Sequence, residues 1–259
     1  MIQPSTSVAT ALAPPALTIY AAGSLCAALT EIARSFEQDQ ALKVQMTFGA
    51  SGLLKDRIVG GERPQVFASA NMAHPAALVS AGKADRVRAF TRNALCVLAA
   101  PGFSLQGKAL AMRLLDADVR VGTSTPGADP SGDYAFSLFD RIEVTGAAGP
   151  GSAIRLKRKA LQLTGGQDSP RPPAGASVYG ELVASGQADV FVTYCTNAAL
   201  ARRERPSLQV LDLPAAINVT APYGLTLLTP VSAPAQAYAR YLLRPDGQAI
   251  LASHGFSAP

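Results

Sequence analysis

Short apolar runs and longer stretches with one apolar face alternate along the chain. The short runs predict eight strands, at 17–22, 43–48, 65–70, 94–100, 119–124, 188–194, 208–213 and 223–229. Apolar residues spaced three and four apart predict helices between most of them, at 25–39, 52–60, 73–81, 132–140, 152–163, 177–185 and 234–243. This alternation predicts an α/β fold in which mixed, mostly parallel sheets are flanked by helices.

Eight strands fit two sheets better than one, so the sequence predicts two lobes. The expected division is a disordered tail at 1–16, a first lobe formed by 17–97 and 222–259, and a second lobe at 98–221. The chain then crosses twice between the lobes, and two crossings form a hinge about which the lobes can close. A polar excursion at 140–176, rich in Pro and Gly at its end, is expected to decorate the second lobe.

Hydrogen-bond donors stand at several joints where a predicted strand ends and a helix begins. Ser24, Ser51 and Ser131 occupy three joints, Val178 follows Ser177 at a fourth helix start, and Tyr194 ends a strand. Ligands of open α/β sheets bind beyond the carboxyl ends of the strands, and free N–H groups at helix starts attract anions. Serine is also a common helix cap, which is the alternative reading of each joint. Donors from both halves of the chain suit a cleft between two lobes.

Composition narrows the classes of partner. The chain has 259 residues and a net charge of +5, but its basic residues are dispersed and Trp is absent, so no nucleic-acid surface is predicted. No apolar run reaches about 18 residues, so no membrane span is predicted. The cysteines at 26, 96 and 195 suggest neither a disulfide framework nor a metal site, and Cys96 is expected to be a small core residue.

Enzymatic readings fit less well. "GASGL" resembles the G-x-S-x-G nucleophile elbow, but Leu53 replaces the second glycine. His74 and His254 have no obvious carboxylate partner in the sequence, so a serine hydrolase using Ser51 is the weaker alternative. P-loop, dinucleotide and zinc-protease motifs are missing from the sequence. We therefore expect a binding protein without a cofactor.

Six segments, in this order, carry a family resemblance: "TIYAAGSLCAALTEIARSFEQ", "VQMTFGASGLLKDRI", "RPQVFASANMAH", "VGTSTPGADPSGDYA", "VYGELVASGQADVFVTY" and "LLRPDGQAILASHGF". From about residue 17 to 257 the chain resembles the periplasmic molybdate-binding proteins of bacterial ABC transporters, which are type II periplasmic solute-binding proteins. The resemblance implies a two-lobed fold with the ligand in the interlobe cleft, a periplasmic location, a monomer and an ABC transporter permease as partner. The implied ligand is molybdate or tungstate, so molybdenum is bound only as its oxyanion.

The resemblance also assigns roles. Ser24 and Ser51 would donate hydroxyls from the first lobe, Ser131 and Val178 backbone N–H groups from the second, and Tyr194 the hydroxyl that closes the site. All are neutral donors, and none bonds the metal directly. Cys195 to Asn197 replace a Gly/Ser-Asp turn common in the family, and Gln65 replaces an Asp. These departures leave open another small anion, such as sulfate, an organic carboxylate or a metal complex.

The same fold also serves as the effector domain of transcriptional regulators. That reading requires a helix-turn-helix segment, and residues 1–16 are too short to supply one. Cys26 and Cys195 both stand near joints, so they are expected to lie near the pocket, with roles that the residues alone do not define.

Overall fold

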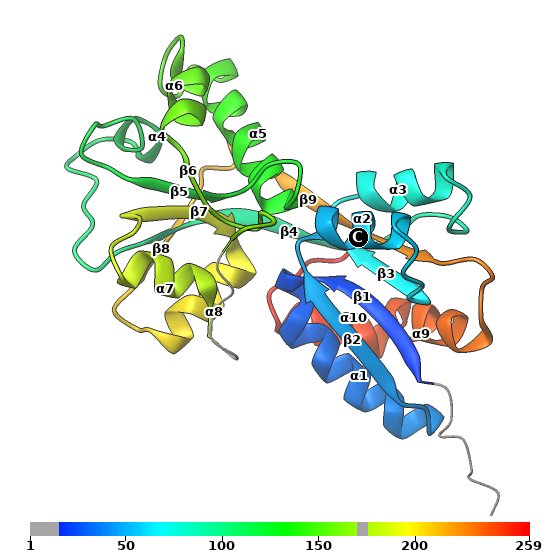
Figure 1. Ribbon diagram of the computed structural model, residues 1–259. Helices are drawn as coiled ribbons and strands as arrows, with labels where there is room; N and C mark the ends of the chain where they lie inside the picture. The colour runs from blue at the N-terminus through cyan, green and yellow to red at the C-terminus, as the bar shows by residue number, and fades with distance from the viewer. Residues whose placement is uncertain (1–15, 170–175) are drawn as a thin grey trace, which may run out of the picture.

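Two lobes joined by two strands make up the molecule (Figure 1). The computed structural model describes residues 16–169 and 176–259, so the predicted tail lies outside the described residues except for Ala16. The joining strands are β4 (Arg88–Ala99) and β9 (Thr220–Leu227), which run antiparallel to each other. None of the helices within the described ranges is long and apolar enough to cross a membrane.

The first lobe combines the beginning and the end of the chain. Its elements are β1 (Leu17–Ala22), η1 (Gly23–Leu25), α1 (Cys26–Gln40), β2 (Val44–Gly49), α2 (Ser51–Val59), β3 (Val66–Ser69), α3 (Ala73–Ser80), α9 (Ala233–Leu243) and α10 (Pro245–Ser253). Strand β1 pairs in parallel with β2 and β3, and β9 closes this sheet antiparallel to β3. Because the three parallel strands share one direction, their carboxyl ends lie at one edge of the lobe.

The second lobe is built from the middle of the chain. Its elements are α4 (Leu110–Arg113), β5 (Val121–Ser124), α5 (Pro130–Val144), α6 (Ser152–Lys159), β6 (Leu161–Thr164), α7 (Val178–Ala184), β7 (Val190–Tyr194), α8 (Cys195–Glu204) and β8 (Gln209–Asp212). Strand β5 pairs in parallel with β6 and β7, whereas β4 is antiparallel to β7 and β8. Helices cover both faces of this sheet (Figure 1).

Strand β4 belongs to both sheets. Its residues 88–94 pair with β9, and its residues 95–99 pair with β7 and β8. All nine strands therefore form one continuous, curled sheet rather than two separate ones. The predicted α/β fold with mixed sheets flanked by helices is confirmed. The predicted lobe boundaries at 97/98 and 221/222 fall inside β4 and β9, and they stay predictions.

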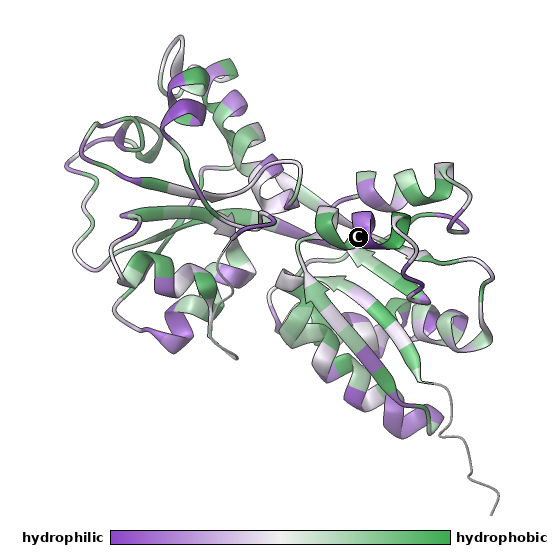
Figure 2. Cartoon of the chain, viewed as in Figure 1, coloured by the Kyte–Doolittle hydropathy of each residue, from purple (hydrophilic) through white to green (hydrophobic). Residues whose placement is uncertain are grey.

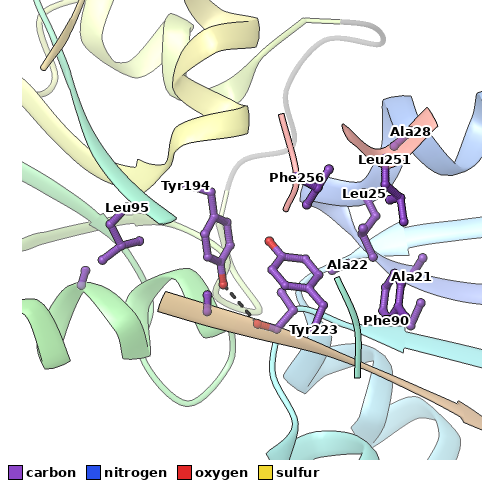
Figure 3. Close-up of a cluster of buried hydrophobic side chains, with 14 of the residues drawn as sticks. Ala21, Ala22, Leu25, Ala28, Phe90, Leu95, Tyr194, Tyr223, Leu251 and Phe256 are labelled. Atoms are coloured by element: carbon purple, nitrogen blue, oxygen red, sulfur yellow. Dashed lines mark hydrogen bonds between the residues drawn. The ribbon is translucent and has the colours of Figure 1, made fainter. Parts of the chain in front are cut away.

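One hydrophobic core runs through both lobes and the joint between them. Apolar residues concentrate on the strands and on the helix faces turned toward them (Figure 2). Phe36 on α1 and Phe139 on α5 belong to the same buried cluster. Tyr194 and Tyr223 of this cluster lie at the joint (Figure 3). Fully burying a large apolar side chain contributes about 1.5–3 kcal/mol, so the joint itself is held by burial as well as by backbone hydrogen bonds.

Four elements differ from the expectation, and the first is the short helix α4, which lies in a stretch where no element is predicted. Residues 161–163 were expected at the end of a helix but begin β6, because Leu161 and its successors pair in parallel with β5. Helix α8 starts directly after Tyr194, in a stretch where no helix is predicted, and α10 extends the C-terminal helical region. The excursion 140–176 thus contributes α6 and β6 to the second lobe.

The cysteine prediction is wrong. Cys96 and Cys195 form a disulfide, with their Cα atoms 4.8 Å apart. The antiparallel register of β4 and β7 explains the pairing, because it sets Cys96 opposite Thr193, two residues before Cys195. Cys96 is buried, as expected of a core residue, but as half of a covalent link. Cys26 is free and exposed.

Candidate functional site

Ser24 and Ser51 lie at two neighbouring strand–helix joints, as the sequence predicts. Strand β1 ends at Ala22, and its register pairs Ala22 with Gly49, the last residue of β2. The chain turns at once into a helix after each strand, with Ser24 in η1 and Ser51 as the first residue of α2. The two hydroxyls therefore come from adjacent strands at the same edge of the first sheet.

Ala70 links Ser51 to Tyr194 across the two lobes. The backbone N–H of Ala70, directly after β3, donates to Ser51 Oγ at 3.1 Å. Its carbonyl oxygen accepts from the Tyr194 hydroxyl at 3.4 Å. A side chain from α2 and one from the end of β7 thus meet on either side of a single residue.

Tyr223 on β9 extends this arrangement to Ser24. Ser24 Oγ and the Tyr223 hydroxyl share a hydrogen bond of 2.9 Å, and the rings of Tyr223 and Tyr194 lie 5.6 Å apart between the lobes (Figure 3). Asn93 on β4 donates to the Tyr223 hydroxyl at 3.4 Å and to Thr196 Oγ1 at 2.8 Å. Burial raises the pKa of both tyrosines, so their hydroxyls stay protonated and can donate at any physiological pH.

The loop before α5 brings Ser131 to the interface. The N–H of Gly52 on α2 donates to the Ala128 carbonyl at 2.9 Å, so the start of α2 touches the residues just before Ser131. Ser131 is fully buried, and its backbone N–H donates to Asp129 Oδ1 at 3.0 Å. The N–H group that the resemblance assigns to the ligand is therefore engaged by a carboxylate in this structure.

Val178 is the first residue of α7, as predicted, but none of the hydrogen bonds described above connects it to the other four positions. Ser177 caps the helix by accepting from the Gly180 N–H at 3.3 Å, which leaves the Val178 N–H outside that bond. The ring of the next residue, Tyr179, packs edge-on against Phe191 of β7, with 5.2 Å between the ring centroids. The structure thus gathers Ser24, Ser51 and Tyr194, adds Ser131 through the α2 contact, and leaves the ligand role of all five a prediction.

Neither histidine bonds to Ser51 in the described part of the chain. His254 Nε2 bonds Glu31 Oε2 at 2.8 Å, and the backbone N–H of His74 donates to Asn71. A nucleophilic serine needs a base within hydrogen-bond reach, so the geometry does not form a hydrolase triad. Within residues 16–169 and 176–259, no three His, Cys, Asp or Glu side chains gather as metal ligands would.

Two surface cavities lie elsewhere. They measure about 280 and 320 Å³ and share Glu62, Arg63 and Pro64 in their walls. These residues precede β3, so the cavities lie at the amino ends of the parallel strands, opposite Ser24 and Ser51. The candidate site is instead a closed junction of polar groups between the lobes.

Sequence reasoning missed three polar groups of this junction: Asn93, Asp129 and Tyr223. Asp129 carries a signal, since Asp before Pro at a helix start marks an N-cap. Asn93 and Tyr223 lie on β4 and β9, and only the pairing of these strands reveals that they face the site.

Over residues 17–257 the sequence matches the family described as bacterial extracellular solute-binding protein. The chain belongs to this family. It is 36% identical over 214 residues to the uncharacterized protein PM1146 of Pasteurella multocida (strain Pm70), a match that covers 82% of this chain and 87% of that protein. Members of the family are solute-binding proteins rather than enzymes.

Solved structures confirm the periplasmic binding protein fold. The periplasmic molybdate-binding protein of Azotobacter vinelandii is 20% identical with a TM-score of 0.69, and the match covers 94% of this chain and 99% of that one. The sulfate-binding protein SubI of Mycobacterium tuberculosis H37Rv is 17% identical with a TM-score of 0.72, covering 93% and 86%. At these identities the likeness concerns the fold alone.

Proposed function

We propose that this chain is the solute-binding component of an ABC importer, and that it captures molybdate or tungstate between its lobes and delivers it to a membrane permease. The observation that carries the proposal is the meeting of Ser51 and Tyr194 at Ala70, with Ser24 on the adjacent strand. The family and the fold shared with a molybdate-binding protein support it. The disulfide is in keeping with an oxidising compartment such as the periplasm.

Neutral donors suit reversible capture of a dianion. Hydroxyls and helix N–H groups spread the compensation of charge over several modest hydrogen bonds. The bond from Tyr194 to the Ala70 carbonyl is 3.4 Å long, beyond the usual range for O–H···O. Turning this hydroxyl from Ala70 to a charged oxygen therefore costs little and gains a stronger bond.

Sulfate is the second candidate ligand. It has the same tetrahedral shape and charge as molybdate, and a sulfate-binding protein shares the fold. The two ligands differ in size, so the distinction depends on how tightly the lobes close.

A panel of anions tests the proposal. Molybdate, tungstate, sulfate and phosphate are each added to the purified chain, and its melting temperature is measured. A ligand at a hundred times its Kd should stabilise the protein by about 2.7 kcal/mol, a readily visible shift. We expect the largest shifts with molybdate and tungstate. A panel in which no tetrahedral oxyanion raises the melting temperature would overturn the proposal.

Removing one hydroxyl from the site should weaken binding. Ser24→Ala and Ser51→Ala are each expected to cost about 1.5–3 kcal/mol of oxyanion affinity, because each removes a hydrogen bond to a charged group. Calorimetry with molybdate measures the loss. Ser137→Ala is the matched control, since Ser137 is an exposed serine of α5 that bonds only to the Asp133 carbonyl. If both site variants bind as tightly as the control, the two hydroxyls serve only their bonds to Tyr223 and to the Ala70 N–H and do not contact the ligand.

A further inference from the structure

A half-buried carboxyl group lies beside the proposed oxyanion site. Asp129 caps α5, a helix of 15 residues, by accepting from the Ser131 N–H at 3.0 Å. Its neighbour Ala128 accepts the Gly52 N–H of α2, which places Asp129 directly at the contact between the lobes. Gly165 packs against the carboxyl group so closely that a Cβ atom there would lie 2.6 Å from Oδ2.

Two buried hydroxyls next to Asp129 point to a missing partner. Ser124 and Ser131 are both 0% exposed, and within the described residues neither Oγ atom has a hydrogen-bond partner. Ser124 is the last residue of β5 and approaches both Asp129 and Tyr179, although without a hydrogen bond of normal geometry. Buried hydroxyls are nearly always hydrogen-bonded, so this pair indicates a site that a polar ligand completes.

We propose that Asp129 is a further residue of the oxyanion site and that it binds the ligand as the protonated acid. The inference rests on the proposed function. An ionised carboxylate would repel a dianion, whereas a carboxylic acid keeps one oxygen for the Ser131 N–H and offers its O–H to a ligand oxygen. The proton comes from solvent and is bound by the carboxylate as the ligand enters, so no other bond breaks. Capture of a fully deprotonated oxyanion then takes up one proton.

Because of its surroundings, the Asp129 carboxyl group gains or loses a proton near neutral pH. Burial raises the pKa of Asp129 to about 6, although the Ser131 N–H and Ser124 act in the opposite direction and Asp133 adds to the rise. The titratable groups that face it from α5, α7, β7 and β9 are Asp133, Tyr179, Tyr194 and Tyr223. The tyrosines stay neutral because burial raises the pKa of each hydroxyl.

His74 on α3 is a competing titratable group. Burial, with the charge of Lys55, lowers the pKa of its imidazole, whereas the charges of Asp133 and Asp56 act in the opposite direction. Protonation of His74 would also favour an anion at low pH. A variant of Asp129 that leaves His74 intact therefore separates the two effects.

Calorimetric titration with molybdate and with sulfate, neither of which carries a proton between about pH 6 and 8, tests the proposal. For the wild-type chain, affinity should fall by up to about tenfold per unit of pH over this range. Repeating the titration at about pH 8 in buffers of different ionisation enthalpy should show about one proton taken up per ligand. The Asp129→Asn variant carries a neutral group of the same shape and should bind the anion more tightly than wild type at this pH. Its affinity should not change with pH, and no proton should be taken up on binding.

Asp133→Asn is the matched control. Asp133 lies one turn along the same helix and accepts from the Gly127 N–H at 2.7 Å, so the variant removes a nearby charge but leaves the Asp129 carboxyl in place. The affinity of this variant should still fall with rising pH. Wild-type binding that is independent of pH, or a slope that persists in Asp129→Asn, would overturn the role of Asp129 while leaving the proposed function intact. If no oxyanion binds to wild type at any pH, both fall.

Discussion

Replacing Cys96 and Cys195 together by serine is expected to lower the free energy of unfolding by about 4–5 kcal/mol. The disulfide joins residues separated by 99 positions, and closing a loop of about that length restricts the unfolded chain by about 4.7 kcal/mol in the chain-entropy account. It also holds the start of α8 against β4, the strand that pairs with strands of both lobes. Urea unfolding followed by circular dichroism measures the loss as a lower midpoint.

Cys26→Ser is the control for the loss of a thiol, because Cys26 is free and exposed. It should unfold at the wild-type midpoint. Treating the wild-type chain with a reductant should reproduce the destabilisation of the double serine variant. A double variant as stable as wild type, or a wild-type midpoint indifferent to the reductant, would contradict the assigned pairing.

Gly52→Ala is expected to weaken oxyanion binding by about 150-fold, the equivalent of about 3 kcal/mol. A Cβ atom at this position would lie 2.6 Å from the carbonyl oxygens of both Gly127 and Ala128. These are backbone atoms that cannot swing aside, so the methyl group pushes the lobes apart where they meet. The methyl group therefore destabilises the closed arrangement of the lobes, which in the proposed function holds the ligand. Calorimetric titration with molybdate measures the change.

Gly49→Ala provides the comparison for this variant. It adds the same methyl group just before α2, where the nearest atoms belong to the Leu54 side chain at 3.6 Å, an ordinary contact. Its affinity should stay close to wild type. Equal affinities for the two glycine variants would show that the contact between α2 and the Ala128 loop is not needed in the bound form.

Much of the fold follows from local patterns in the sequence. The buried face of α1, which includes Leu29, Ile32 and Phe36, is visible in the spacing of its apolar residues. The short strand β6 is not, because its four residues depend on pairing with β5, and edge strands carry little pattern of their own. The sharing of β4 between sheets also depends on partners more than a hundred residues away.

Part of the candidate site can likewise be predicted from local sequence patterns, and part cannot. The positions of Ser24 and Ser51 follow from the spacing of apolar residues, which changes at each joint from the pattern of a strand to that of a helix. The pairing of Cys96 with Cys195 and the approach of Tyr223 to Ser24 depend on tertiary contacts between distant strands. Asp129 is visible as a helix cap, but its place at the contact between the lobes follows only from packing.

The contact between Gly52 and Ala128 joins two main-chain atoms, one from each lobe. Such a contact does not depend on the identity of the side chains, so substitutions at the surrounding hydroxyl and carboxyl groups would leave it in place.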